Sequence, residues 1–258
     1  MAYRLPIYLD SSTTNQPSHD FEIRLDRPIL FENDVPHEIG LVSLSTYYSF
    51  FNIKAASQNN EFKYSSDGGE TWKIIVVPDG NYNIWDWIDY IKFQINKLED
   101  DEEAYDTNIY MRANTNTLRL EITLFNDYQI DFTHQRLYYI LGYIQQILAA
   151  GVHVSENHVN ITDDVQSLII HCSVCDSMSY SNTGPSDRLF SFIPNTPPGS
   201  AININVETPY YCGISRNRID SIRIKLTDQL NRPINLNGES LSLVLYLQPR
   251  QLLNKKLK

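Results

Sequence analysis

The sequence predicts an all-β protein, a single jelly-roll β-sandwich with an inserted helix-containing segment. Roughly a dozen short alternating or apolar runs are separated by turn residues at intervals of about ten residues, which is typical of sandwiches and jelly rolls. Only residues 84–98 place apolar side chains at a clear helical spacing. We expect this helix and its neighbours, about residues 67–143, to form an inserted α+β subdomain within one jelly-roll domain of residues 1–258.

The clearest strand pattern lies near the C-terminus, in residues 219–248. Every second residue is apolar in the run 222–226 and again in the run 241–247. The connection 227–238 is polar and holds Asn, Asp, Pro and Gly, which favour turns. We therefore expect the two runs to pair as an antiparallel hairpin with one face in the core.

The N-terminal part of the chain is expected to supply three strands. The first covers residues 3–9 and is followed by a polar loop. The second covers residues 21–25 and should end before Pro28, because proline restricts the residue before it and has no backbone N–H. The third is predicted as one long strand over residues 37–53, which are rich in apolar and aromatic side chains.

The middle of the chain predicts a hairpin and then the helix. Residues 61–64 and 71–77 flank an Asp-Gly-Gly sequence, which is a strong hairpin signal. Asn83 is the expected N-cap of the helix 84–98, and the acidic run Glu99–Glu103 is expected to close it.

The rest of the chain is predicted as short strands and loops, with one brief helix in residues 134–142. The strands are expected at residues 109–112, 118–124, 128–132, 168–174, 189–193 and 202–206. Polar loops at residues 177–187 and 195–200 offer material for an interface. The basic tail, residues 250–258, is expected to fray.

The composition of the chain argues against several classes of function. The formal charge of −10 argues against nucleic-acid binding over the whole surface, because phosphate binding needs a basic footprint. A local basic patch stays open, and the basic tail is the candidate for such contact. The 17 tyrosines are typical of pleated surfaces and interfaces. The first residues hold no apolar signal segment, and no apolar run is long enough to span a membrane. We expect a soluble intracellular protein without a membrane partner.

Three cysteines are too few for a disulfide framework and indicate a reducing compartment. Cys172 and Cys175 have CxxC spacing, yet residues i and i+3 of a strand point to opposite faces, so we expect the two thiols to diverge. A tetrahedral zinc site needs two further ligands, and only Cys212 and scattered histidines remain. The expected state is three unpaired thiols without metal.

Two polar clusters hold residue types that could form a site. His153 and His158 lie near His171 and the pair Asp163-Asp164, a set that suits metal binding or acid–base chemistry. His153 and His158 are five residues apart, and this spacing matches neither one face of a helix nor one face of a strand. A solvated loop is therefore the preferred interpretation. The run Glu99–Glu103 lacks the spacing of a calcium loop and is interpreted as a charged helix end.

An aromatic stripe in residues 47–51 and the basic tail each allow two interpretations of their function. The aromatic stripe could stack on sugars or bases, but core and interface packing is the preferred interpretation for Tyr47, Tyr48, Phe50 and Phe51. The tail is interpreted as solvated, with nucleic acid or an acidic partner as the alternative for Arg250, Lys255, Lys256 and Lys258. The chain has no Gly-x-Ser-x-Gly, P-loop or Gly-x-Gly-x-x-Gly motif. We therefore predict no enzyme, no catalytic or metal-binding residue, and no cofactor.

Four groups of segments, in order along residues 21–247, carry a resemblance to a known family. They are Phe21–Ile29 with His37–Leu44 and Phe51–Ile53; Pro78–Tyr82 leading into a helix that ends at Gln94–Asn96; Ile140–Tyr143; and Thr208–Tyr210 with Ile219–Leu226, Thr227–Gln229, Asn231–Arg232 and Gly238–Leu247. This ordered set resembles the minor capsid (penton) proteins of Polinton/Maverick elements, adintoviruses and virophages. Tyr143 stands where that family has phenylalanine, and residues 144–146 match no continuation of its pattern.

The resemblance implies a structural protein of the virion, assembled inside the host cell. It implies a single jelly roll that stands in five copies at an icosahedral vertex, a homopentamer ringed by double-jelly-roll major capsid subunits. No catalytic residues come with it, and an Arg-Gly-Asp receptor motif is absent from the sequence.

Two other classes remain open on the sequence. A carbohydrate-binding jelly-roll module would present a concave platform of exposed aromatic side chains. A jelly-roll hydrolase or cupin-like enzyme would need His and carboxylate ligands that converge on inward-facing strand positions.

Overall fold

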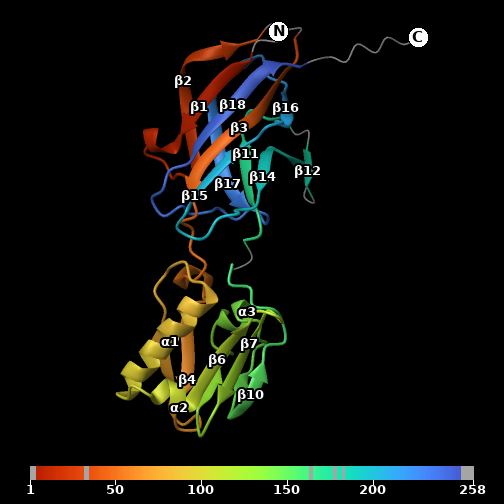
Figure 1. Ribbon diagram of the computed structural model, residues 1–258. Coiled ribbons are helices and arrows are strands. Elements are labelled where there is room, and N and C mark those ends of the chain that lie inside the picture. Colours follow the sequence, from red (N-terminus) through yellow and green to blue (C-terminus); the bar gives the residue numbers. More distant parts are fainter. Residues whose placement is uncertain (1–3, 32–34, 163–164, 177–178, 182–183, 251–258) are drawn as a thin grey trace, which may run out of the picture. The chain divides into compact units, whose positions relative to one another are not determined.

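The computed structural model describes residues 4–31, 35–162, 165–176, 179–181 and 184–250, and the chain divides into two compact units (Figure 1). The roll unit combines residues 1–50 with residues 165–258, and the inserted unit is residues 51–164. The inserted unit extends on both sides of the range 67–143 named from the sequence. At its start, Ile53 bridges to Gly80, which ties the first residues to this unit.

Two large antiparallel sheets form the sandwich of the roll unit. The five-stranded sheet has the order β1-β18-β3-β15, and β16 pairs with the other end of β3. Its strands are β1 (Leu5–Asp10), β18 (Ser242–Pro249), β3 (His37–Tyr47), β15 (Ala201–Asn205) and β16 (Tyr211–Ile214). The four-stranded sheet has the order β14-β11-β17-β2, from β14 (Arg188–Phe192), β11 (Leu168–Cys172), β17 (Arg218–Asp228) and β2 (Asp20–Leu30).

Successive strands of the roll unit pass repeatedly between the two sheets. β1 lies in the first sheet, β2 in the second and β3 in the first again; later β17 and β18 divide between the sheets in the same way. This strand order is that of a jelly roll. The inserted unit interrupts the roll between β3 and β11. The predicted fold class, a jelly roll with an inserted helix-containing segment, is confirmed.

One continuous apolar core fills the space between the two sheets. Every second residue of β17 and β18 contributes to it, which includes Ile222, Ile224, Leu226, Leu243, Leu245 and Leu247. A small hairpin of β12 (Ser179–Ser181) and β13 (Gly184–Ser186) occupies part of the predicted 177–187 loop. A short 3-10 helix, η1 (Ser11–Thr13), follows β1.

The predicted hairpin of β17 with β18 is wrong. β17 pairs with β11 and β2, whereas β18 pairs with β1 and β3 in the facing sheet. The connection of residues 229–241 carries the chain across the sandwich and contributes Ile234, Leu236 and Leu241 to the core. Both strands still turn their alternating apolar residues into the same core, so the predicted faces are confirmed although the predicted partner is not.

Two predicted strand ends also differ. β2 continues through Pro28 to Leu30, because it is an edge strand and its pairing with β17 is irregular between Ile219 and Ser221, where a missing N–H is tolerated. β3 ends at Tyr47 and does not run on to Ile53. Tyr48 leaves the strand and stacks on Phe50 with ring centroids 4.3 Å apart.

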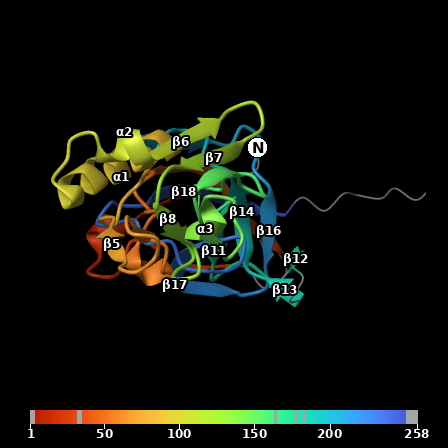
Figure 2. The same ribbon diagram turned by 90° about the horizontal axis from the view of Figure 1, so that it is seen from below.

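The inserted unit has its own core between two small sheets and three helices. The sheets have the orders β5-β4-β8-β9 and β10-β7-β6. The elements are η2 (Ala55–Ser57), β4 (Glu61–Ser65), β5 (Lys73–Val76), α1 (Ile84–Glu99), α2 (Ala104–Asn108), β6 (Ile109–Asn114), β7 (Arg119–Leu124), β8 (Gln129–Asp131), α3 (Leu137–Ile140), β9 (Ile147–Leu148) and β10 (Gly151–Val154). Figure 2 shows α1 and α2 beside β6, and these elements are in contact.

Helix α1 follows the predicted pattern closely. The Asn83 side chain accepts hydrogen bonds from the backbone N–H groups of Trp85 and Asp86, and Asp100 ends the helix in a left-handed conformation. Trp87 is completely buried and meets the ring of Phe62 edge-on at 5.7 Å, so the predicted apolar face packs on β4. Among the described residues, no helix is long and apolar enough to cross a membrane.

Candidate assembly surfaces

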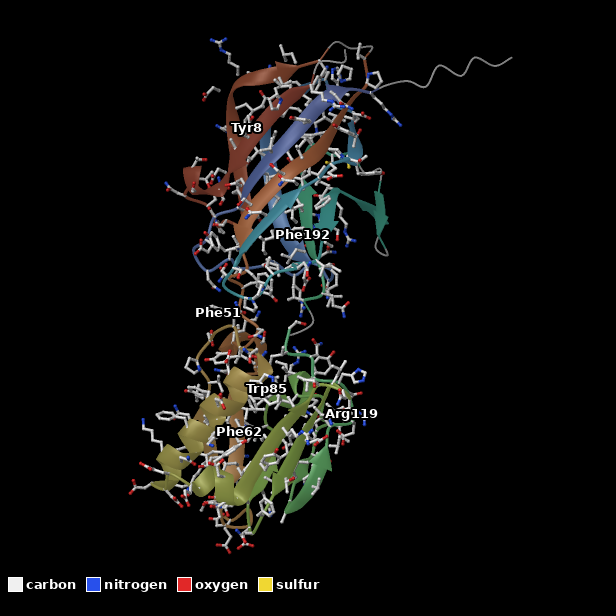
Figure 3. All side chains as sticks on the ribbon, in the orientation of Figure 1. Tyr8, Phe51, Phe62, Trp85, Arg119 and Phe192 are labelled. Carbon is white, nitrogen blue, oxygen red and sulfur yellow. The ribbon has the colours of Figure 1, made fainter. Side chains whose placement is uncertain are left out.

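Three rows of side chains on the outward face of the five-stranded sheet, called the uncharged face below, hold a single charged residue, Asp10; the row beyond them carries Glu38 beside Gln248. Residues that alternate with the buried leucines form rows across the strands, and small polar, amide and aromatic side chains fill them. The rows are Tyr8, Val244, Ser43 and Asn205; Asp10, Ser242, Ser45 and Asn203; and Pro6, Tyr246, Gly40 and Tyr211. Tyr8 is 74% exposed (Figure 3). Depletion of charge with enrichment of tyrosine is typical of the centre of a protein interface.

This uncharged face holds an open hollow of about 650 Å³, lined in part by Ser43, Ser45, Asn203 and Asn205. Ser45 donates a hydrogen bond of 2.8 Å to Asn203 Oδ1, and Ser242 donates one of 2.7 Å to Asp10 Oδ2. Tyr8 is the single aromatic residue among those that line it. The hollow therefore differs from the aromatic platform that a carbohydrate-binding jelly roll would present.

The outward face of the four-stranded sheet is charged with both signs. Arg223 of β17 binds Asp20 of β2 through two hydrogen bonds of 2.6 and 2.8 Å. These hydrogen bonds lower the pKa of the Asp20 carboxyl. Further along β17, Arg218 pairs with Asp220 at 2.6 Å, and Lys225 lies opposite Asp20. The two faces of the jelly roll thus differ in chemistry.

The two units also differ in net charge. The inserted unit holds 18 of the 31 Asp and Glu residues and only 8 of the 21 Lys and Arg residues. The roll unit therefore holds 13 residues of each sign, and the whole net charge of −10 belongs to the inserted unit. Packing roll units against one another would concentrate no net charge, whereas packing inserted units would be opposed by repulsion.

The predicted divergence of the two CxxC thiols is wrong. β11 ends at Cys172, and a turn closed by the hydrogen bond from Cys175 N–H to the Cys172 carbonyl brings the second thiol back. The Cys175 thiol contacts the thiols of Cys172 and Cys212, and these contacts together with burial raise its pKa. All three cysteines are free and buried. Among the described residues, no group of three or more His, Cys, Asp or Glu side chains is arranged to hold a metal ion.

His171 lies in β11, on the outward side of the four-stranded sheet, opposite Lys225 of β17. Its Nδ1 lies 2.7 Å from Asp187 Oδ1 and its Nε2 lies 2.9 Å from Thr227 Oγ1. A carboxylate, an imidazole and a hydroxyl in this order are the parts of a nucleophilic triad. The Thr227 residue is only 8% exposed, and its hydroxyl also donates to the Asp228 carbonyl, so we interpret the set as a link between strands.

The other predicted polar candidates are dispersed. His153 lies in β10, where its Nε2 hydrogen-bonds the Ala149 carbonyl, so the solvated-loop prediction is wrong for this residue. His158 lies in the segment after β10, and Asp163 and Asp164 lie outside the described residues. In the acidic run, Glu99 is engaged by Lys73 and by the Tyr64 hydroxyl, as a charged helix end would be.

The aromatic stripe is divided between burial and exposure. Phe50 is buried in the core of the roll unit, Tyr48 packs against it and Tyr47 is 46% exposed. Phe51 is half-buried at the start of the inserted unit (Figure 3). In the tail, Arg250 donates its backbone N–H to the Pro36 carbonyl, and Lys255, Lys256 and Lys258 lie outside the described residues.

The uncharged face was missed by the sequence reasoning. Its residues are scattered over β1, β3, β15, β16 and β18, and none stands out within its own strand. The available signal was the alternation itself: Ser43, Ser45, Asn203, Asn205 and Ser242 occupy the outward positions of predicted strands. Only the strand order shows that they lie side by side.

Comparisons with known proteins bear on the fold. No protein-family model matches the chain, and a search of curated proteins finds no match. Among solved structures, the mavirus penton protein is similar with a TM-score of 0.53 and 12% identity, over 96% of this chain and 100% of that chain. A structure of the Sputnik virophage is similar with a TM-score of 0.48 and 11% identity, over 95% of this chain and 98% of that chain. The chain therefore has the jelly-roll fold of a viral penton protein.

Proposed function

We propose that this chain is a structural capsid protein, the penton (minor capsid) subunit that closes the vertices of an icosahedral shell. The observation that carries the proposal is the jelly-roll strand order with an inserted unit between β3 and β11, the fold that the chain shares with the mavirus penton protein. The ordered sequence motifs over residues 21–247 point the same way, and the proposal assigns no catalytic role to any residue.

In this proposal five copies form a closed ring through their roll units. A cyclic ring is heterologous, so each subunit needs two different surfaces that fit one another. The uncharged face of the five-stranded sheet supplies one of them, and a different surface of the neighbouring roll unit packs on it. Each contact should bury on the order of 1,200–2,000 Å². The neutral charge of the roll unit favours this packing, and the acidic inserted units then lie outside the contacts.

The proposed partners are therefore four further copies of this chain and a double-jelly-roll major capsid protein around the ring. The proposed location is the virion, with assembly inside the host cell. Neither a membrane nor nucleic acid is assigned as a partner.

The test introduces a charge at the centre of the uncharged face. Val244 lies on β18 between Tyr8 and Ser43, and Val244→Arg should lower the pentamer fraction at least tenfold in native mass spectrometry of the full chain, alone and with the major capsid protein. The matched control is Val152→Arg, since Val152 lies on a strand of the inserted unit and is 73% exposed. Circular dichroism checks that both variants fold.

Two results would contradict the proposal. The first is a ring that forms equally well with a folded Val244→Arg variant, which would remove this face from the contact. The second concerns assembled particles: labelled copies on the flat facets, or absent from shells whose vertices are complete, would exclude the vertex position.

A further inference from the structure

The inserted unit carries an open hollow that the capsid role does not use. It has a volume of about 480 Å³, within the range of roughly 300–1,000 Å³ that small-ligand sites occupy. Its lining residues all carry polar or aromatic polar side chains: Arg119, Tyr139, Glu156, Asn157, His158 and Asn160. Figure 3 labels Arg119, the first residue of β7.

The backbone around the hollow is held in place from two sides. The segment after β10 donates hydrogen bonds from Asn157 N–H to the Gly142 carbonyl and from Asn160 N–H to the Ile140 carbonyl, at 2.8 and 2.7 Å. On its other side, Val159 N–H donates to the Leu118 carbonyl at 2.8 Å. A site that is already formed loses little conformational entropy when a ligand binds.

Gly142 permits this arrangement. Its φ of +81° is one that residues with a side chain rarely adopt, and a Cβ there would lie 2.3 Å from the Asn157 carbonyl oxygen. Any other residue would therefore push the segment of residues 156–160 away from α3 and change the shape of the hollow.

The side chains present complementary chemistry. The Glu156 carboxylate is fixed by hydrogen bonds from Ile144 N–H at 3.2 Å and from Gln146 Nε2 at 2.9 Å. The side chain of Arg119 is half-buried and makes no hydrogen bond or ion pair within the described part of the chain, not even with Glu156 of the same lining, whose hydrogen-bond partners are Ile144 and Gln146. A half-buried guanidinium without an anion is a matched partner for a carboxylate, which it binds through two parallel hydrogen bonds.

Tyr139 completes the lining with an aromatic ring. Its side chain is 43% exposed, and the Arg136 guanidinium lies 5.7 Å from its ring centre. An exposed aromatic ring offers an apolar face with a polar edge, which suits the C–H face of a sugar ring beside its hydroxyls. The amide of Asn157 offers both a donor and an acceptor for such hydroxyls.

We propose that this hollow binds a carboxylate-bearing sugar, with Arg119 on the carboxylate and Tyr139 against the ring. The proposal does not depend on the penton assignment, because it concerns a surface of the inserted unit alone. Its failure would leave the assembly test untouched, and a failed assembly test would leave this site untouched.

The experiment is a ligand-observed saturation-transfer NMR measurement on the full chain. The probes are glucuronic acid and N-acetylneuraminic acid, with methyl glucoside and acetate as the neutral-sugar and bare-carboxylate comparisons. We expect saturation transfer to at least one acidic sugar, and at least tenfold weaker binding of both methyl glucoside and acetate. The variant Arg119→Gln should weaken binding of the acidic sugar at least tenfold.

The matched control is Arg112→Gln, which removes the same charge from an exposed residue of β6 in the same sheet. It should bind the acidic sugar as the parent does, and thermal unfolding checks that both variants are folded. The proposal is overturned if neither acidic sugar binds, if acetate binds as tightly as the sugars, or if the two arginine variants lose binding equally.

Discussion

The hydroxyl of Tyr64 donates a hydrogen bond of 2.8 Å to Oε1 of Glu99, which joins strand β4 to the last residue of helix α1. The Tyr64 side chain is fully buried, and Lys73 of β5 pairs with the same carboxylate at 2.6 Å. Burial, and then the neighbouring Glu99 carboxylate, raise the pKa of the Tyr64 hydroxyl, so the hydroxyl remains protonated and keeps donating. Residues 64, 73 and 99 thus fix the C-terminal end of α1 on its sheet.

Removing this hydroxyl should destabilise the inserted unit. Tyr64→Phe keeps the ring and deletes one hydrogen bond to a charged acceptor, which contributes about 1.5–3 kcal/mol. The measurement is the free energy of unfolding from urea titration. The control is Tyr110→Phe, at a tyrosine of β6 that is 54% exposed. Equal losses in the two variants would show that the link to Glu99 contributes nothing.

Trp87 should be the most sensitive position on α1. The side chain is completely buried against Phe62, and deleting a buried aromatic ring leaves a cavity, so Trp87→Ala should cost about 3–5 kcal/mol. The same substitution at Trp85, which is 47% exposed, should cost far less. Both are measured by thermal and urea unfolding. A Trp87→Ala variant that melts within a degree or two of the parent would mean that the helix is peripheral.

Acid should weaken the strand link made by Asp187. The hydrogen bond to His171 lowers the pKa of the Asp187 carboxyl below its ordinary value. A carboxyl whose folded pKa is lowered stabilises the fold above its unfolded pKa of about 3.9, and this stabilisation is lost as the pH falls through the folded value. Between about pH 5 and pH 3, the melting temperature of the parent should therefore fall more steeply than that of Asp187→Asn.

The control for this acid test is Asp89→Asn, because Asp89 is an exposed residue of α1 without a histidine partner. It should keep the slope of the parent. If Asp187→Asn also follows the parent slope, the carboxyl at position 187 is not linked to folding.

The three thiols should be metal-free and unreactive in the native protein. Cys175 contacts both Cys172 and Cys212 in the core, yet a tetrahedral zinc site needs a fourth ligand that the described residues do not place there. A thiol reagent should therefore modify all three only after unfolding, and metal analysis should find no stoichiometric zinc. Zinc held jointly by Cys172 and Cys175 would refute this prediction.

The sequence by itself determined which residues face the core. Alternation in residues 222–226 and 241–247 was enough, because side chains of a strand point to opposite faces with a period of two and the apolar residues of these two runs recur with that period. It also determined α1, because the Asn83 cap and the apolar stripe that includes Trp87 are local signals that occur together. The hairpin of β4 and β5 was likewise predicted from its Asp-Gly-Gly turn.

Only the tertiary structure shows which strands pair and which distant side chains meet. β17 and β18 carry the same pattern whether they pair with each other or face each other across the core, so alternation cannot choose between the two sheets. The thiols of Cys172 and Cys175 meet because β11 ends at Cys172, where the turn to Cys175 begins, a boundary that local pattern does not resolve. Arg119 and Tyr139 line one hollow only because backbone hydrogen bonds bring residues 118 and 140 to the same short segment.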